Sequence, residues 1–243
     1  MAGQQIVFFD IPSKVPEKSW SINAWKTRLL LNYKGLHYTT EWLEYPEIRT
    51  RLEKHVLPNR DDTPYTIPTI RFPDGTYVMG GFQIAKEINE RYPEPRFLVE
   101  SRSLIEFRRV VGEIWDAFRG NYLLLVHNRV LNEASTGYFR TTREEDIGMT
   151  LEQFEKEQGG EQSWSQVGAS LQKVTAMLKD NAEGPFFEGK EISYIDSLWV
   201  AFLISCRRLG EDVFQEVLER SGDTKVHTNL LEAVEPWIKR SSY

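Results

Sequence analysis

The residues best suited to chemistry lie in one short segment, SWSINAWKTRLLLNYKG, which runs from Ser19 to Gly35. Two serines and Asn23 stand where a helix is expected to begin. A Ser or Asn at a helix start commonly caps the helix by accepting a free backbone N–H. The same position lies at the positive end of the helix dipole, where a bound anion is stabilised. The segment by itself therefore leaves two interpretations open, a structural cap and a catalytic or anion-binding site.

The elements around this segment predict a βαβ unit. The apolar run IVFFD (6–10) before a proline indicates a buried strand. From Ile22, apolar residues at helical spacing predict a helix that ends at Gly35. The segment LHYTTEWLEY (36–45) is rich in aromatic and β-branched residues, which predicts a second strand. Strands joined by a helix in this way are expected to be parallel.

The first domain is expected to span residues 1–95. After the βαβ unit, its sequence predicts a helical segment followed by two strands and a helix. RLEKH (51–55) is at best a short helix. TIPTIRFPDGTYVM (66–79) predicts two short strands joined by a turn at Pro73-Asp74-Gly75. FQIAKEINERYP (82–93) then predicts the closing helix. The expected order is βαβ, a helical segment, and ββα.

A second domain, residues 100–243, is predicted to be all-helical. It follows a linker, PEPRFLVESR (93–102), and its first helix carries an apolar stripe from Leu104 to Leu125. Two more apolar segments predict helices, and the charged run YFRTTREEDIG (138–148) is interpreted as a solvated turn. The predicted fold class is a small α/β domain followed by an all-α domain.

Composition restricts the classes of function. The net charge of -6 argues against nucleic acid as a partner. No apolar run reaches the roughly 18 residues of a membrane span, and the N-terminus lacks the pattern of a signal peptide. The single Cys206 fits a reducing compartment, so a cytoplasmic location is expected. The histidines have no spacing typical of a metal site, so no metal is expected.

Three separated motifs resemble the cytosolic glutathione transferases, and most closely their fungal etherase-related class. SINAWKTRLLLNYKGL with TEWLEYPEI resembles the family's Ser-x-Asn-x-x-Lys helix start. Ile67-Pro68 resembles the hydrophobic residue and cis-proline before the third strand. GPFFEGKEISYIDSLWVAFL resembles a capping segment of the helical domain, and Ser193 and Asp196 in it have the spacing of a capping box. The resemblance implies a thioredoxin-like first domain, an all-helical second domain, glutathione as cofactor and a homodimer.

The resemblance places the family's catalytic serine at Ser21, with Ser19 as the alternative and Asn23 as a further amide donor. Glutathione chemistry needs a thiolate, and a free thiol titrates at about 8.5. A hydrogen bond to the charged form contributes about 1.5–3 kcal/mol, which lowers the thiol pKa by roughly one to two units. A serine hydroxyl would thus act as a donor and not as a nucleophile. The alternative is that Ser21 only caps its helix.

Further residues are expected to hold glutathione. A cis peptide at Ile67-Pro68 would leave the N–H and C=O of Ile67 free to pair with the cysteinyl part, in the manner of a β-strand. Lys26 is expected to be solvated or to face glutathione. His55 or Arg60, in the loop before this strand, is expected to bind the glycyl carboxylate.

Gly80 and Gly81 depart from the family pattern. The family has an acidic residue and a serine there, which bind the ammonium and carboxylate of the γ-glutamyl group. Backbone N–H groups at a helix start still suit a carboxylate, but the ammonium loses its counter-charge, at a cost of about 1.5–3 kcal/mol. Glutathione would then bind weakly, another acidic group would replace the lost one, or the site would have moved to a different ligand.

The second substrate is expected between the domains, against the middle of the long helix. The candidates are Trp115, Phe118, Arg119 and Tyr122, of which Arg119 could bind a carboxylate or enolate and the aromatic residues could equally form core. The leading function is an enzyme that uses a Ser-stabilised glutathione thiolate to conjugate or isomerise a hydrophobic small molecule, such as a fungal secondary metabolite. The alternative is a glutathione-independent enzyme, or a carrier of hydrophobic ligands, on the same fold.

Overall fold

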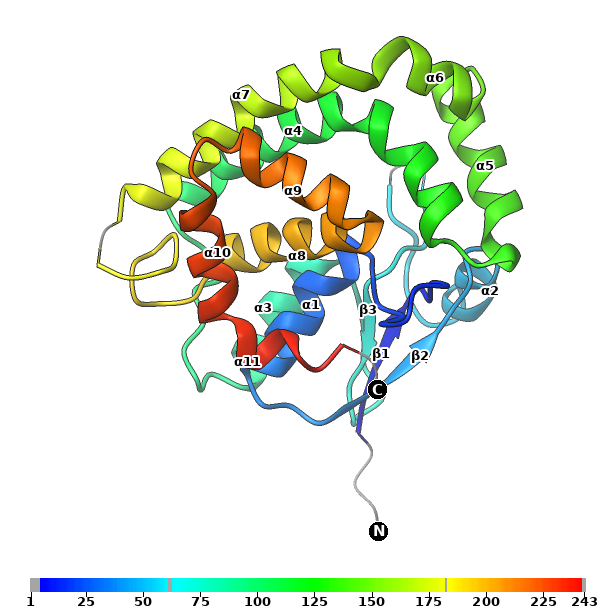
Figure 1. Cartoon of the computed structure of the whole chain (residues 1–243). Coiled ribbons are helices and arrows are strands. Elements are labelled where there is room, and N and C mark those ends of the chain that lie inside the picture. Colours follow the sequence, from blue (N-terminus) through cyan, green and yellow to red (C-terminus); the bar gives the residue numbers. More distant parts are fainter. Residues whose placement is uncertain (1–4, 61–62, 182, 242–243) are drawn as a thin grey trace.

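The computed structural model describes residues 5–60, 63–181 and 183–241. A four-stranded sheet with three helices forms the N-terminal part, and every later element of the described chain is a helix (Figure 1). None of the helices in these ranges combines the length and the apolar character that a membrane span needs.

The sheet has the four predicted strands, including the parallel pair and the hairpin that the sequence predicts. β1 (Ile6–Asp10) pairs in parallel with β2 (Tyr38–Trp42) and antiparallel with β3 (Thr69–Arg71). β3 continues antiparallel to β4 (Tyr77–Met79), so the order across the sheet is β2-β1-β3-β4. Gly75, in the predicted turn between β3 and β4, has φ +90°, a conformation that glycine adopts without strain.

The helices of the N-terminal part are α1 (Ile22–Tyr33), α2 (Glu47–Leu52) and α3 (Gly81–Arg91). α1 and α3 lie where the sequence predicts them, whereas α2 begins four residues before the expected segment 51–55 and overlaps it only at Arg51 and Leu52. Pro46 precedes α2, and a proline favours the start of a helix. The carboxylate of Glu47 also accepts the backbone N–H of Glu44 (2.8 Å), which stabilises this earlier start.

The helical part consists of α4 (Ser103–Leu125), the π-helical turn η1 (Val126–Val130), α5 (Glu133–Ile147), α6 (Leu151–Gln158), α7 (Gly160–Lys179), α8 (Tyr194–Leu209), α9 (Glu211–Arg220), α10 (Thr224–Ala233) and α11 (Glu235–Ile238). The segment 138–148, expected to be a solvated turn, instead forms most of α5. Its charges pair along the helix, as between Arg140 and Glu144 (2.8 Å), while Phe139 is buried against the core. Charge density alone therefore gave the wrong prediction here.

α8 begins with the predicted capping box and is buried along most of its length. The Ser193 hydroxyl accepts the N–H of Asp196 (3.4 Å), and the Asp196 carboxylate accepts the N–H of Ser193 (2.7 Å). The same carboxylate accepts the N–H of Phe187 (3.0 Å), which fixes the loop before the helix. Because α8 packs against α1, this helix joins the two parts of the molecule (Figure 1).

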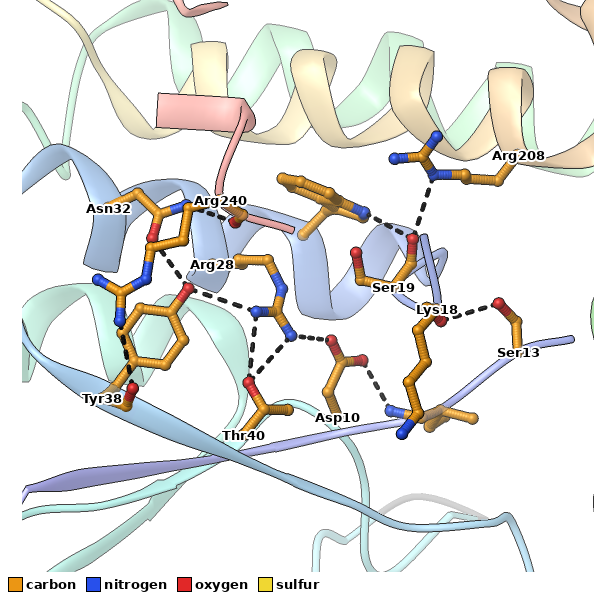
Figure 2. A network of polar contacts seen from close by, with 12 residues as sticks. Asp10, Ser13, Lys18, Ser19, Arg28, Asn32, Tyr38, Thr40, Arg208 and Arg240 are labelled. Carbon is orange, nitrogen blue, oxygen red and sulfur yellow. Dashed lines mark hydrogen bonds and ion pairs between the residues drawn. The ribbon is translucent and has the colours of Figure 1, made fainter. Parts of the chain in front are cut away.

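A buried polar network ties α1 to the sheet and to the C-terminal segment (Figure 2). Arg28 in α1 forms an ion pair with Asp10 at the end of β1 (2.7 Å), and both side chains are fully buried. The Tyr38 hydroxyl donates to Asn32 (2.8 Å), whose amide donates to the carbonyl of Arg240 (3.0 Å). Removing one partner of a buried ion pair such as Arg28–Asp10 typically costs about 3–5 kcal/mol of stability. The network thus holds α1 firmly against the sheet.

Candidate active site

The two serines before α1 have different surroundings. Ser21 is the N-cap residue, yet its hydroxyl accepts no hydrogen bond from the helix. The same hydroxyl forms no hydrogen bond with any other residue that the structure describes. Ser21 is 6% exposed. Ser19 is fully buried with an unpartnered Oγ, and its carbonyl is held by the indole of Trp25 and by Arg208, both at 3.3 Å (Figure 2). The hydroxyl that remains available to a ligand is therefore that of Ser21.

The Lys26 side chain, which bonds to Asn23, reaches from α1 to the start of α3. The Lys26 ammonium donates to the Asn23 side-chain oxygen (2.9 Å). The stem of Lys26 passes so close to Gly81 that a Cβ at that glycine would lie 2.7 Å from the lysine Cε. Burial, together with the charge of Arg108, lowers the pKa of Lys26 to about 8. α1 thus places a cation beside the first turn of α3.

The segment before β3 brings a free backbone edge to the same region. The Ile67-Pro68 peptide bond is cis, as predicted. Ile67 is buried, and its N–H and C=O form no hydrogen bond with any residue that the structure describes. The carbonyl of Pro68 accepts the N–H of Gly80 (2.9 Å), which joins this segment to the start of α3. Buried backbone groups without partners are rare, and a ligand can satisfy them.

The start of α3 lacks side chains at its cap. Gly80 is the N-cap residue with φ +93°, where an acidic residue would be strained. The N–H of Ile84 bonds to the carbonyl of Gly80 (2.9 Å), which leaves the N–H groups of the preceding residues of the first turn without intrahelical partners. This helix start therefore offers backbone donors and no carboxylate.

A cavity of about 370 Å³ opens beside this turn, between the two parts of the molecule. It is lined by Lys26, Gly80, Gly81, Phe82, Gln83, Arg108, Val111, Tyr194 and Leu198. Three of these residues, Lys26, Gly80 and Gly81, are among those that the sequence predicts. Two lining residues are cationic, and no acidic residue of the described chain is among them.

Arg108 and Tyr194 are two of the six lining residues that the sequence analysis did not predict as site residues. Arg108 precedes Val111 by one helical turn, so the two share a face of α4. Tyr194 directly follows the capping residue of α8, and burial raises the pKa of its hydroxyl to about 12. The sequence shows that Arg108 and Tyr194 lie next to buried positions of their helices. It does not show that they share one cavity, because this depends on how α4 and α8 pack near α1.

Comparison with known proteins identifies the family. Residues 20–91 match the glutathione S-transferase N-terminal domain, and residues 110–237 match the glutathione S-transferase C-terminal domain. The chain belongs to the glutathione S-transferases. The predicted fold class, a thioredoxin-like domain followed by a helical domain, is confirmed by these matches and by the sheet topology.

Three similar proteins come from fungi. The glutathione S-transferase-like protein ustS of Aspergillus flavus is 30% identical over 231 residues, 87% of this chain and 84% of that protein. The crystal structure of glutathione transferase GSTFuA2 from Phanerochaete chrysosporium has a TM-score of 0.82 and 32% identity, and covers 96% of this chain and 98% of that one. Glutathione S-transferase CsGST63524 of Ceriporiopsis subvermispora, crystallised with glutathione, has a TM-score of 0.80 and 28% identity, with 96% and 97% covered.

His55 and Arg60 do not border the cavity of this glutathione S-transferase. The His55 ring stacks on Tyr77 at 4.4 Å between centroids, with the planes 6° apart. Arg60 is exposed, next to the residues 61–62 that lie outside the described ranges. Their assignment to the glycyl carboxylate stays a prediction.

The four residues expected around the second substrate do not line the cavity either. Phe118 is fully buried against Trp164, at 5.1 Å between ring centroids, which is a core position. The Arg119 guanidinium pairs with Asp146 of α5. Tyr122 is buried, which raises the pKa of its hydroxyl, and its ring meets that of the half-buried Trp115 edge-on at 4.6 Å. The cavity lies against the first half of α4, whereas the sequence predicts the second-substrate site against the middle of this helix.

Cys206, the single cysteine of the chain, does not line the cavity. Cys206 is buried in α8, and burial raises the pKa of its thiol. Within the described ranges, no three His, Cys, Asp or Glu side chains gather as a metal site would require.

Proposed function

We propose that this member of the glutathione S-transferase family is a glutathione-using enzyme in which the Ser21 hydroxyl donates a hydrogen bond to the glutathione thiolate. The observation that carries this proposal is the hydroxyl of Ser21, which stands at the positive end of α1 and makes no bond to its own helix. Asn23, on the first turn of α1, is the second candidate donor, and the buried Ser19 is the third.

The magnitudes suit this role. A hydrogen bond to a charged acceptor contributes about 1.5–3 kcal/mol, and a helix N-terminus adds about 0.3–1 kcal/mol. At about 1.36 kcal/mol for each unit of pKa, the two together lower a thiol pKa from about 8.5 to about 7 or below. No separate base is then needed to form the nucleophile at neutral pH.

The neighbouring groups support the binding of a peptide. The unpaired N–H and C=O of Ile67 suit the backbone of the cysteinyl residue. The cavity beside α3 suits the γ-glutamyl carboxylate, because Lys26 and Arg108 are cationic and the first turn of α3 has free N–H groups. Glutathione in the related Ceriporiopsis subvermispora structure agrees with this use of the fold.

The second substrate is proposed to be a hydrophobic electrophile such as a fungal secondary metabolite; the similar proteins named above come from fungi. In conjugation, the thiolate forms a C–S bond that persists in the product. In isomerisation, the thiolate adds to a conjugated alkene and the electron pair moves to the carbonyl oxygen. Rotation about the former double bond and loss of the thiolate then return the alkene in its other geometry.

A second candidate rests on the missing acidic residue at Gly80. Without a counter-charge for the γ-glutamyl ammonium, the chain would be a glutathione-independent enzyme or a carrier of hydrophobic ligands. Calorimetric titration with glutathione separates the two: binding at millimolar concentration or tighter supports the enzyme, and its absence supports the second candidate.

Mass balance with an enone substrate under excess glutathione distinguishes the two reactions. Accumulation of one adduct for each substrate consumed indicates conjugation, and a product isomer with glutathione unchanged indicates isomerisation. Full turnover without glutathione would contradict the proposed use of the thiol.

A homodimer in the cytoplasm remains our expectation for this protein. Leu57 and Ile105 are large apolar side chains that are almost fully exposed in the single chain, which agrees with burial in an interface. Sedimentation equilibrium of the full chain measures the association directly, and a monomer at micromolar concentration would contradict it.

A further inference from the structure

Gly81 and Lys26 form a matched pair. A Cβ at Gly81 would lie 2.7 Å from the Cε and 3.2 Å from the Cδ of Lys26, and 3.3 Å from the hydroxyl of Tyr194. A serine at this position would therefore displace the lysine stem. The absence of a side chain at Gly81 is what lets the lysine lie over the first turn of α3.

The cavity that results has an unbalanced positive charge. Lys26 is bonded to the neutral oxygen of Asn23, and Arg108 has no ion-pair partner within the described ranges. The guanidinium of Arg108 lies over the ring of Phe82, 4.4 Å from its centroid. The carboxylate of Glu100, near this end of α4, is already paired with Lys86 (2.6 Å).

We propose that this cavity binds an organic carboxylate and selects against a neighbouring ammonium group. Lys26, Arg108 and the free N–H groups of α3 all attract an anion, and no lining residue of the described chain carries a carboxylate that could pair with a cation. An amino acid end would bring its ammonium against two like charges. The preferred ligand carries the carboxylate alone.

The apolar part of the lining defines the rest of the ligand. Phe82, Val111 and Leu198 face the cavity beside the two cations, and its volume of about 370 Å³ accommodates an acyl chain or a single ring. The class of ligand is therefore a carboxylic acid with an apolar body. This carboxylic acid can be a separate ligand that binds beside glutathione, or the acyl end of a peptide.

The inference rests on the proposed function in one respect, because the γ-glutamyl end of glutathione is expected to lie in the same cavity. Calorimetry on the full chain with two matched pairs of probes tests glutathione binding and selection against an ammonium group separately. The first pair is glutathione and its deaminated analogue, glutaryl-cysteinyl-glycine. The second pair is 2-amino-4-phenylbutyrate and 4-phenylbutyrate. In each pair only the ammonium is removed.

In both pairs the ligand without the ammonium is expected to bind at least threefold more tightly. Tighter binding of glutathione than of its deaminated analogue would overturn the inference and leave the proposed function intact. Binding of 4-phenylbutyrate with no binding of either tripeptide would support the inference and contradict the proposed function. Failure of every probe to bind at about 10 mM would overturn the inference.

Variants test the residues. Lys26→Gln and Arg108→Gln are each expected to weaken 4-phenylbutyrate binding at least tenfold. Arg102→Gln, on an exposed residue at the start of the same helix, removes the same charge outside the cavity and is the control, expected within twofold of the unmodified protein. Equal losses in Arg102→Gln and Arg108→Gln would show a general charge effect and contradict a site.

Gly81→Ala tests the pairing of glycine and lysine. The added methyl group is expected to displace Lys26 and weaken 4-phenylbutyrate binding severalfold, without loss of thermal stability. Gly112→Ala, on α4, is the control, because beyond its chain neighbours and the backbone of its own helix no atom lies within 4 Å of the added Cβ, and it is expected to leave binding unchanged.

The pH dependence of binding provides a readout that a purely structural role would not change. Lys26 has a pKa of about 8, and the charged or titratable groups facing it are Arg108 of α4 and Tyr194 of α8, whose pKa of about 12 keeps it neutral. Affinity for 4-phenylbutyrate is expected to fall as pH rises from 7 to 9, when the lysine loses its charge. This fall should disappear in Lys26→Gln, and its persistence there would overturn the role of Lys26.

Discussion

The starts of α1 and α8 carry the same residue at the N-cap, Ser21 and Ser193, in different hydrogen-bonding states. Ser193 is fully buried and exchanges hydrogen bonds with Asp196, so its hydroxyl is committed to the helix. Ser21 has the extended backbone of a cap residue, with φ −65° and ψ 125°, but its side chain forms no cap bond. One serine completes a helix, and the other is left for a ligand.

The difference shows that residue type at a helix start does not define its role. The third residue of α8 is Asp196, whose carboxylate returns the bond to Ser193, whereas the third residue of α1 is Ala24, which cannot. A capping serine is a candidate donor for catalysis only where its hydroxyl has no partner in the helix.

The largest expected effect is that of Ser21→Ala. Removal of the donor to the thiolate should lower kcat/KM roughly 10- to 150-fold, because a charged hydrogen bond of about 1.5–3 kcal/mol is lost. The thiol pKa of bound glutathione, followed by thiolate absorbance against pH, should rise by about one to two units. The melting temperature should stay nearly constant, because no cap bond is removed. Unchanged kinetics would move the role to Asn23 or Ser19.

The second-largest expected effect is a fall in the free energy of unfolding at low pH, caused by His227, which bonds to Trp199 of α8. Trp199 of α8 donates to the Nδ1 of His227 (2.9 Å), and burial lowers the pKa of His227 to about 4. Between about pH 6.5 and pH 4 the unfolded chain binds this proton and the folded chain does not, so the free energy of unfolding falls as pH falls. The loss by pH 4 should be at most about 3 kcal/mol.

His227→Gln isolates this contribution. The difference in free energy of unfolding between the unmodified protein and His227→Gln, from urea denaturation at several pH values, should decrease from pH 7 to pH 4. Other groups titrate equally in both proteins and cancel. A difference that is independent of pH would show that His227 is protonated equally in both states and would contradict the assignment.

Ser193→Ala should act on stability and not on catalysis. Loss of a helix cap costs about 1–2 kcal/mol, and here the carboxylate of Asp196 also loses the hydroxyl at 2.6 Å. Thr150→Ala at the start of α6 is the exposed control, since Thr150 accepts the N–H of Gln153 (3.1 Å), and it should cost less. A change in kcat of Ser193→Ala larger than that of Ser21→Ala would reverse the comparison.

The smallest effect is expected for Ser19→Ala. Its buried hydroxyl has no partner, so replacement by a methyl-like side chain should change the free energy of unfolding by less than about 1 kcal/mol, in either direction. Activity should be unchanged, because the contacts that hold this residue use its carbonyl. A tenfold loss of activity would instead make Ser19 the donor.

Much of the fold could be predicted because its signals are local. The individual strand segments, the turn at Gly75 and the capping box of Ser193 each depend on residues within one strand, one hairpin or one helical turn. The prediction for 138–148 was wrong because its charges pair along a helix, a pattern that charge density alone does not distinguish from a solvated turn. The start of α2 depends on Glu44 and Glu47, which lie outside the predicted segment 51–55.

The candidate site divides in the same way. The sequence by itself determined that a serine stands at the start of α1, that Ile67 precedes a proline, and that two glycines replace side chains at the start of α3. Only the tertiary structure decided which serine hydroxyl is free, and which cations share the cavity beside Gly81. Caps and turns are set by neighbours along the chain, whereas Arg108 and Lys26 reach one cavity only because α1, α4 and α8 pack together. A cavity is a property of that packing, and no single segment contains it.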